Sequence, residues 1–247
     1  QNKDELLVWA TTRVRTHLKA SLENMKIEWS KHDRKAGRWE DVDVERCQMM
    51  ATNGILMHIN EVENCLTSVS KKILEEWRNG ARTQWPAPDG RGFQLDQHPL
   101  SQDGDVTWIE AWEISRPWFV DPDAKPFSMN AVHPEHWFQG EYDLVYSWDG
   151  SIRIIDIKAS LGNNDRSGDY VKQLRMYAFL WWHTHEKQQE VDGLEIWYLA
   201  ANSQKMIEKP TIEEMDEMGS ELKELWSQLR EVTPDIEQCP PKPAPMR

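Results

Sequence analysis

The chain has 247 residues, enough to bury a substantial core in one large domain or two small ones. Its 42 acidic and 29 basic residues give a formal net charge of −13, the wrong sign for a protein that coats nucleic acid nonspecifically. The 3 cysteines lack C-x-x-C spacing, which indicates neither a zinc site nor a disulfide framework, and no apolar stretch is long enough to span a membrane. We therefore expect a soluble, cytoplasmic protein.

Helical periodicity occurs twice in the first third of the chain. An amphipathic helix is predicted over residues 4–30, with an apolar side formed by Leu7, Val14, Leu18, Met25 and Trp29. A second apolar stripe runs from Ile55 to Trp77, ends at Gly80 and belongs to a helix that carries His58. The charged segment 31–45 between the two helices is predicted to be a loop.

The middle of the chain changes to the period of strands. Residues 80–105 are rich in Pro, Gly and Asp and predict a mobile loop, after which VTWIEAWEI (106–114) is strand-like. A proline-rich excursion over 117–134 follows, and then EYDLVYS and SIRIIDIK flank a turn at Asp149-Gly150. The second of these strands is apolar on both faces, so we expect it to lie in the centre of a sheet that is covered on each side.

The turn sets the register of this hairpin. If Asp149-Gly150 is a two-residue loop, facing residues have numbers of constant sum, which places Asp143 opposite Asp156. The same register pairs Tyr146 with Arg153 and Leu144 with Ile155. Directly opposed Cβ atoms are roughly 5 Å apart and like charges repel there, so a positive group must lie between the two acids. Lys158 follows Asp156 by two residues and shares its strand face.

Two acids and a lysine at the end of a buried hairpin are typical of a divalent-metal site for phosphodiester chemistry. The carboxylates of Asp143 and Asp156 and the backbone carbonyl of Ile157 would provide hard oxygen ligands. Lys158 would hold the attacking water or a phosphate oxygen. The alternative is an acid pair at a solvated sheet end with Lys158 as an exposed counter-charge. Glu110 or Glu113, on the preceding predicted strand, could join the metal shell.

The last third of the chain adds a helix, a strand and a helix. A loop over 162–168 leads to a helix whose buried face carries Val171, Leu174, Ala178 and Trp181, and LEIWYLA is a strand. Residues 211–229 predict a helix that is opened by a capping box of Thr211 and Glu214. The tail 232–247 is too rich in proline to be regular. This order of elements implies a layered α/β fold with a mixed sheet.

Four ordered motifs resemble those of the RecB-type nucleases of the PD-(D/E)XK superfamily. They are Gly54-Ile-Leu-Met-His58, Gly140-Glu-Tyr-Asp143, Asp156-Ile-Lys158 and Gln173-Leu-Arg-Met-Tyr177. The resemblance covers about residues 50–200. It implies a restriction-endonuclease-like α/β fold in which a mixed central sheet is flanked by helices, with an N-terminal helical extension. The expected division is an extension at 1–50, a nuclease core at 51–231 and the tail at 232–247.

The resemblance also implies roles for single residues. His58, Asp143 and Asp156 would be metal ligands, Lys158 the catalytic lysine, and Gln173 and Tyr177 side chains that line the site and contact DNA. Gln173 and Tyr177 are four residues apart and therefore share one helical face. A nitrogen ligand beside two carboxylates suits Mn²⁺ as well as Mg²⁺, so activity is expected with either ion and more with manganese. Relatives often carry an iron–sulfur cluster, but its late group of three cysteines is missing from this sequence and no cluster is expected.

The sequence thus predicts a metal-dependent DNA nuclease, an exonuclease on DNA ends or single strands, with a helicase or another repair subunit as a possible partner. A catalytically silent module that binds DNA ends in a helicase–nuclease assembly stays open, as does a hydrolase of a non-nucleic substrate. Aromatic rings near the site could stack on unpaired bases. The candidates are Trp85, Trp108, Trp112, Trp118, Trp137 and Trp148.

Overall fold

The computed structural model describes residues 2–31, 38–79, 105–117, 130–135, 138–162 and 167–231. The predicted loop at 80–104, most of the proline-rich excursion and the tail at 232–247 lie outside the described residues. So do Cys239 and three of the tryptophans named above, Trp85, Trp118 and Trp137.

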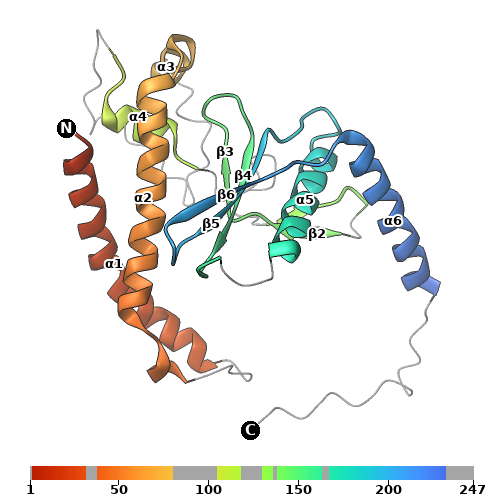
Figure 1. Ribbon diagram of the computed structural model, residues 1–247, viewed down its shortest axis with the longest axis horizontal. Coiled ribbons are helices and arrows are strands. Elements are labelled where there is room, and N and C mark those ends of the chain that lie inside the picture. The colour runs from red at the N-terminus through yellow and green to blue at the C-terminus, as the bar shows by residue number, and fades with distance from the viewer. Residues whose placement is uncertain are drawn as a thin grey trace.

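A mixed sheet of four strands forms the centre of the protein (Figure 1). Its order is β3 (Leu144–Tyr146), β4 (Arg153–Lys158), β5 (Gly193–Tyr198) and β6 (Ser203–Ile207). The β4–β5 pair is parallel, and the two outer pairs are antiparallel. A separate antiparallel ribbon consists of β1 (Asn130–Val132) and β2 (Gln139–Glu141). The predicted α/β fold with a mixed central sheet flanked by helices is confirmed, and so is the central position of β4.

The register predicted for the hairpin is confirmed. Leu144 pairs with Ile155 and Tyr146 pairs with Arg153. The ladder stops there, and a turn closed by the Gly150 NH, which donates to the Ser147 carbonyl at 3.2 Å, completes the connection. The loop is therefore longer than the two residues expected, but the register is unchanged because the turn stays centred between the strands.

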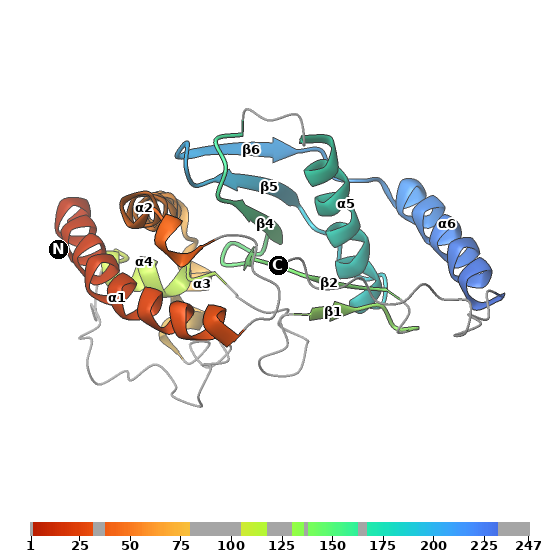
Figure 2. The same ribbon diagram turned by 90° about the horizontal axis from the view of Figure 1, so that it is seen from below.

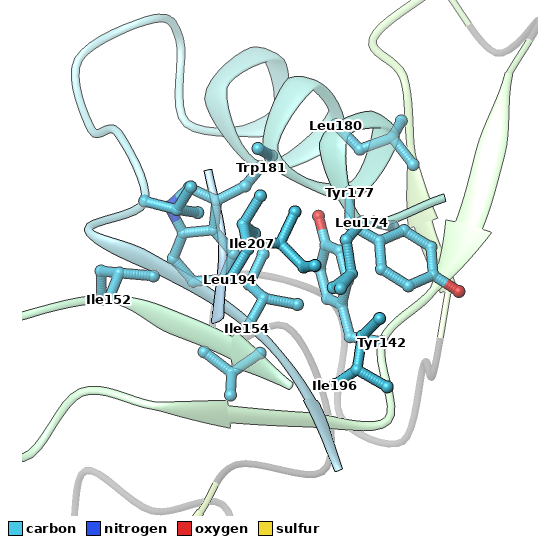
Figure 3. Packing of buried hydrophobic residues seen from close by; sticks show 14 of the residues in the cluster. Tyr142, Ile152, Ile154, Leu174, Tyr177, Leu180, Trp181, Leu194, Ile196 and Ile207 are labelled. Carbon is cyan, nitrogen blue, oxygen red and sulfur yellow. The ribbon is translucent and has the colours of Figure 1, made fainter. Parts of the chain in front are cut away.

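Helix α5 (Ser167–Thr184) covers one face of the sheet. Alternate strand residues point toward it, including Ile154 from β4 and Leu194 from β5, and they pack against Leu174 and Trp181 of the helix (Figure 3). On the far side of α5 lies α6 (Ile212–Glu231), joined to it by a smaller apolar cluster (Figure 2). The capping box predicted for α6 is confirmed, because the Glu214 NH donates to Thr211 Oγ1 and Glu214 Oε2 accepts from the Thr211 NH.

The other face of the sheet is covered by α2 (Val44–Ser68) and α4 (Trp108–Ile114). Ile155 and Trp197, which alternate with the residues that face α5, pack here against Met57 and Val62. Helix α1 (Lys3–Lys31) runs alongside α2 and forms the N-terminal helical region, and the short η1 (Trp39–Asp41) follows it (Figure 2). None of the helices in the described ranges is long and apolar enough to cross a bilayer.

The structure departs from several local predictions. Residues 108–114 form a helix rather than a strand, because Thr107 and Glu110 make a full capping box at its start. The stripe from Ile55 to Trp77 is split between α2 and α3 (Lys71–Arg78), since Ser70 caps the second helix by accepting from the Ile73 NH. Strand β6 was not predicted, because most of its side chains are exposed and polar and it lies at the sheet edge.

Candidate active site

The alternation of side chains along β4 decides which residues meet at the candidate site. Ile155 and Ile157 pack on the α2 side, so Asp156 and Lys158 face α5. Asp143 immediately precedes β3, and extending the observed register by one pair brings it level with Asp156. The acid pair deduced from the hairpin thus lies at the end of the sheet to which β4 and β5 point.

Asp143 is fixed by the backbone of the neighbouring strand. Its Oδ2 accepts a hydrogen bond of 2.7 Å from the Ile157 NH. This contact orients the carboxylate at the end of β4, because a charged acceptor and a backbone donor make a short, directional bond. Ile157 itself lies between Asp156 and Lys158 in the strand.

The carboxylate of Asp156 is buried, which disfavours its charged form. Only 1% of the residue is exposed, and its Oδ2 lies 2.5 Å from Nζ of Lys158. The pKa of Asp156 is nevertheless raised above its usual value, first because burial disfavours the charged form and also because Asp143 is close; the charge of Lys158 opposes both effects. One lysine therefore does not fully compensate the pair of carboxylates.

A chain of hydrogen bonds links Lys158 to helix α5. Nζ of Lys158 donates to Oε1 of Gln173 at 3.3 Å, and Nε2 of Gln173 donates to the hydroxyl of Tyr177 at 2.7 Å. Burial raises the pKa of the Tyr177 hydroxyl, and the nearby acids Asp156 and Asp143 add to this shift. The structure thus brings Gln173 and Tyr177 together with the two acids and the lysine.

The glycine of the Gly140-x-x-Asp143 motif has a steric reason. A Cβ added at Gly140 would lie 2.8 Å from Cδ1 of Leu180 and 3.0 Å from Cε1 of Tyr177. Strand β2 therefore passes so close to α5 that a side chain at this position would require Leu180 and Tyr177 to shift.

The structure places His58 apart from this group. His58 lies on α2, on the opposite face of the sheet, where its Nδ1 is 3.0 Å from the hydroxyl of Tyr146 and its ring makes an edge contact with Trp112. Burial lowers the pKa of His58 to about 4. Five residues earlier on α2, Nδ2 of Asn53 donates to the carbonyl of Leu199, just after β5, at 2.7 Å. The role of His58 as a metal ligand stays a prediction from the sequence.

The glutamates considered for the metal shell also lie elsewhere. Glu110 is on α4, on the α2 side of the sheet, and forms an ion pair with Arg78 at 2.8 Å. Glu113 is 3.6 Å from Arg116. The described tryptophans near the site in sequence, Trp108, Trp112 and Trp148, all pack in the apolar cluster on the α2 side, so none of them lines the acid pair.

Sequence analysis missed one residue of the site, Tyr170. Its ring lies against Lys158, with the centroid 4.6 Å from Nζ. The signal was present in the sequence, because Tyr170 precedes Gln173 by three residues and so shares its helical face.

The donors at this site suit a small, hard divalent cation. Two carboxylates converge there, and Mg²⁺ is commonly held by one or two carboxylates while it keeps several waters. Among the described residues no group of three or more His, Cys, Asp or Glu side chains is placed to hold a metal ion. The fit therefore rests on the carboxylates of Asp143 and Asp156, and the Ile157 carbonyl stays a predicted ligand.

The fold agrees with a comparison of the chain with known families. A model of the PD-(D/E)XK nuclease superfamily matches residues 16–245, and the chain belongs to that superfamily. Membership implies a nuclease, that is, a hydrolase of phosphodiester bonds, and nucleases of this superfamily generally use divalent metal ions. Neither the curated proteins nor the solved structures gave a match.

Proposed function

We propose that this protein is a DNA nuclease of the RecB type that depends on Mg²⁺ or Mn²⁺ and acts as an exonuclease on DNA ends or single strands. The observation that carries the proposal is the meeting of Asp143, Asp156 and Lys158 on one face and at one end of the sheet. Asp143 immediately precedes β3 and Asp156 belongs to β4, so the fold itself assembles this group.

The two acids and the Ile157 carbonyl would hold the ion. A bound divalent cation would neutralise charge that develops on the scissile phosphate and lower the pKa of a bound water. Asp143 is held in place for this purpose by the Ile157 NH. The raised pKa of Asp156 supports the assignment, because buried carboxylates with too little positive charge nearby favour binding of a cation.

Lys158 would bind a phosphate oxygen or the attacking water. Its ammonium has three donors, and the contacts to Asp156 and Gln173 hold it beside the acid pair. Gln173 and Tyr177 would line the path of the DNA and keep Lys158 in position through their mutual hydrogen bond. With a formal net charge of −13, the protein would bind DNA weakly outside the site. We therefore propose that a helicase or other repair subunit supplies further contacts with DNA.

A catalytically silent module that binds DNA ends is the second candidate. It is favoured by the position of His58, because without that residue the site has no nitrogen ligand among the described residues, and Nζ of Lys158 already contacts an oxygen of Asp156. The two candidates differ in one respect, which is whether the protein cleaves DNA when a divalent ion is supplied.

The test is incubation of labelled DNA with Mg²⁺, Mn²⁺ or chelator, using the wild type, Asp156→Asn and Lys158→Ala. Single strands, blunt duplex, circular single strands and RNA are compared in parallel. The proposal expects cleavage of linear DNA by the wild type alone, with chelator abolishing it and circles resisting it. Equal digestion by all three proteins would mean a contaminant, and an inert wild type would leave the scaffold role.

A further inference from the structure

We propose that Tyr170 is a positioning residue for Lys158, an inference that rests on the proposed nuclease function. The ammonium of Lys158 lies over the Tyr170 ring, with Nζ 4.6 Å from the centroid. This is within the range of a cation–π interaction, in which the negative face of the ring attracts the cation. Tyr170 belongs to none of the motifs that the sequence offered.

Helix α5 presents Tyr170 from the same side as the residues already assigned to the site. Tyr170, Gln173 and Tyr177 follow each other at intervals of three and four residues and form one stripe along the helix. Tyr170 is half-buried and packs against the apolar cluster between α5 and the sheet. Its ring is therefore held by the core and does not depend on Lys158 for its place.

The contacts of Lys158 are of two kinds. In the contact with Asp156, Nζ of Lys158 lies 2.5 Å from a carboxylate oxygen, and the proposed metal ion would bind the same carboxylate. The contacts to Oε1 of Gln173 and to the Tyr170 ring are neutral, so a second cation at Asp156 would not compete for them. These two contacts would keep the ammonium beside the reacting phosphate when Asp156 also binds the metal ion.

The surroundings strengthen the contact with the ring. Only 18% of the Lys158 side chain is exposed, and cation–π contacts are stronger where water is excluded. On β5 the register partner of Lys158 is Tyr198, which is buried. Gly162, at φ +75°, lies so close to Tyr198 that an added Cβ would be 3.2 Å from its ring. The loop after β4 thus closes on Tyr198 and shields this end of the strand.

The test compares Tyr170→Phe, which keeps the ring face, with Tyr170→Leu, which removes it. Tyr170→Met serves as a second variant without a ring, and Trp226→Leu on α6 is the control for loss of a partly exposed aromatic residue far from the site. Steady-state cleavage of a short labelled single strand gives kcat and KM for each protein. We expect Tyr170→Phe and Trp226→Leu to stay within about twofold of the wild type, and the variants without a ring to lose about five- to tenfold in kcat with KM unchanged.

Three results would overturn the role of Tyr170 while leaving the nuclease in place. In the first, the wild type cleaves DNA and the variants without a ring have the same kcat. In the second, Tyr170→Phe loses as much kcat as Tyr170→Leu. In the third, the variants without a ring have a higher KM and an unchanged kcat. A wild type that does not cleave with any divalent ion would overturn the nuclease function, and the role of Tyr170 with it. Melting temperatures of all the variants, measured alongside, identify any protein that fails to fold.

Discussion

The carboxylate of Asp143 and the backbone NH of Ile157 are joined by a hydrogen bond of 2.7 Å. Asp143 therefore has two tasks. It accepts a hydrogen bond from the backbone at the end of β4, and it supplies one of the two carboxylates of the acid pair. The two tasks place different demands on the side chain. The hydrogen bond with the Ile157 NH needs only an oxygen acceptor, whereas a metal site needs the negative charge of the carboxylate.

Replacement of Asp143 should separate these tasks. Asp143→Asn keeps an acceptor for the Ile157 NH, whereas Asp143→Ala leaves that NH without one. We expect the alanine variant to have a free energy of unfolding about 1–3 kcal/mol lower than the asparagine variant. Both should lose about 100-fold or more in cleavage. Denaturant unfolding and the cleavage assay measure the two effects, and an active Asp143→Asn would contradict the role of the charge.

Replacement of His58 distinguishes a core residue from a metal ligand. His58→Ala removes the partner of the buried Tyr146 hydroxyl, which should lower the free energy of unfolding by about 1–3 kcal/mol, and His58→Asn, which keeps a polar atom near the position of Nδ1, should lose less. From the structure we expect both variants to bind Mn²⁺ as the wild type does. Loss of Mn²⁺ affinity in both would instead establish the ligand role that the resemblance implied.

Glu110 should matter for stability and not for cleavage. Its ion pair with Arg78 ties α4 to α3, and its bond to the Thr107 NH caps the start of α4. The pKa of Glu110 is lowered because, although burial opposes the charged form, the contacts with Arg78 and Thr107 outweigh it. Glu110→Gln should therefore lower the free energy of unfolding by about 1–3 kcal/mol. Cleavage per folded molecule should be unchanged. A large loss of activity in well-folded protein would instead support a role for Glu110 in the active site.

A pair of histidines should make stability depend on pH. Nε2 of His133 lies 3.0 Å from Nδ1 of His183, linking β1 to α5. Burial, and then the neighbouring His133 and Lys187, lower the pKa of His183 from 6.5 to about 4, and burial lowers that of His133. The unfolded chain thus binds more protons between these values, so stability is full above pH 6.5 and falls as the pH drops toward 4.

Replacement of His183 by Asn should remove much of this pH dependence. Nδ1 of His133 accepts from the Glu135 NH, so Nε2 of His133 donates to Nδ1 of His183. The amide oxygen of Asn can accept the same hydrogen bond, but it does not titrate. Denaturant unfolding of both proteins at pH 7.5, 6, 5 and 4.5 gives the comparison. The stability of the wild type should fall more steeply, and parallel curves would show that the histidine pair carries none of the effect.

The position of the acid pair could be predicted from the sequence because a hairpin has few degrees of freedom. Once the turn at Asp149-Gly150 is recognised, the period of two fixes which side chains share a face, and the pairing of Leu144 with Ile155 followed. The spacing of Gln173 and Tyr177 likewise fixed their common helical face.

The position of α2 relative to the sheet could not be obtained in this way. Periodicity showed that His58 lies on the buried side of a helix, but it does not say against which face of the sheet that helix packs. Residues 108–114 illustrate another limit, since the alternation of Trp108, Glu110 and Trp112 also fits a strand. The capping box of Thr107 and Glu110 decided in favour of a helix.

The central claim is that Asp143 and Asp156 hold a divalent cation, and the most direct test is calorimetric titration with Mn²⁺ in the absence of DNA. Asp156→Asn should lose binding. Lys158→Met should bind Mn²⁺ at least as tightly as the wild type, because it removes the cation that lies 2.5 Å from Oδ2 of Asp156, and should still fail to cleave DNA. Mn²⁺ binding that survives Asp156→Asn unchanged would contradict the account.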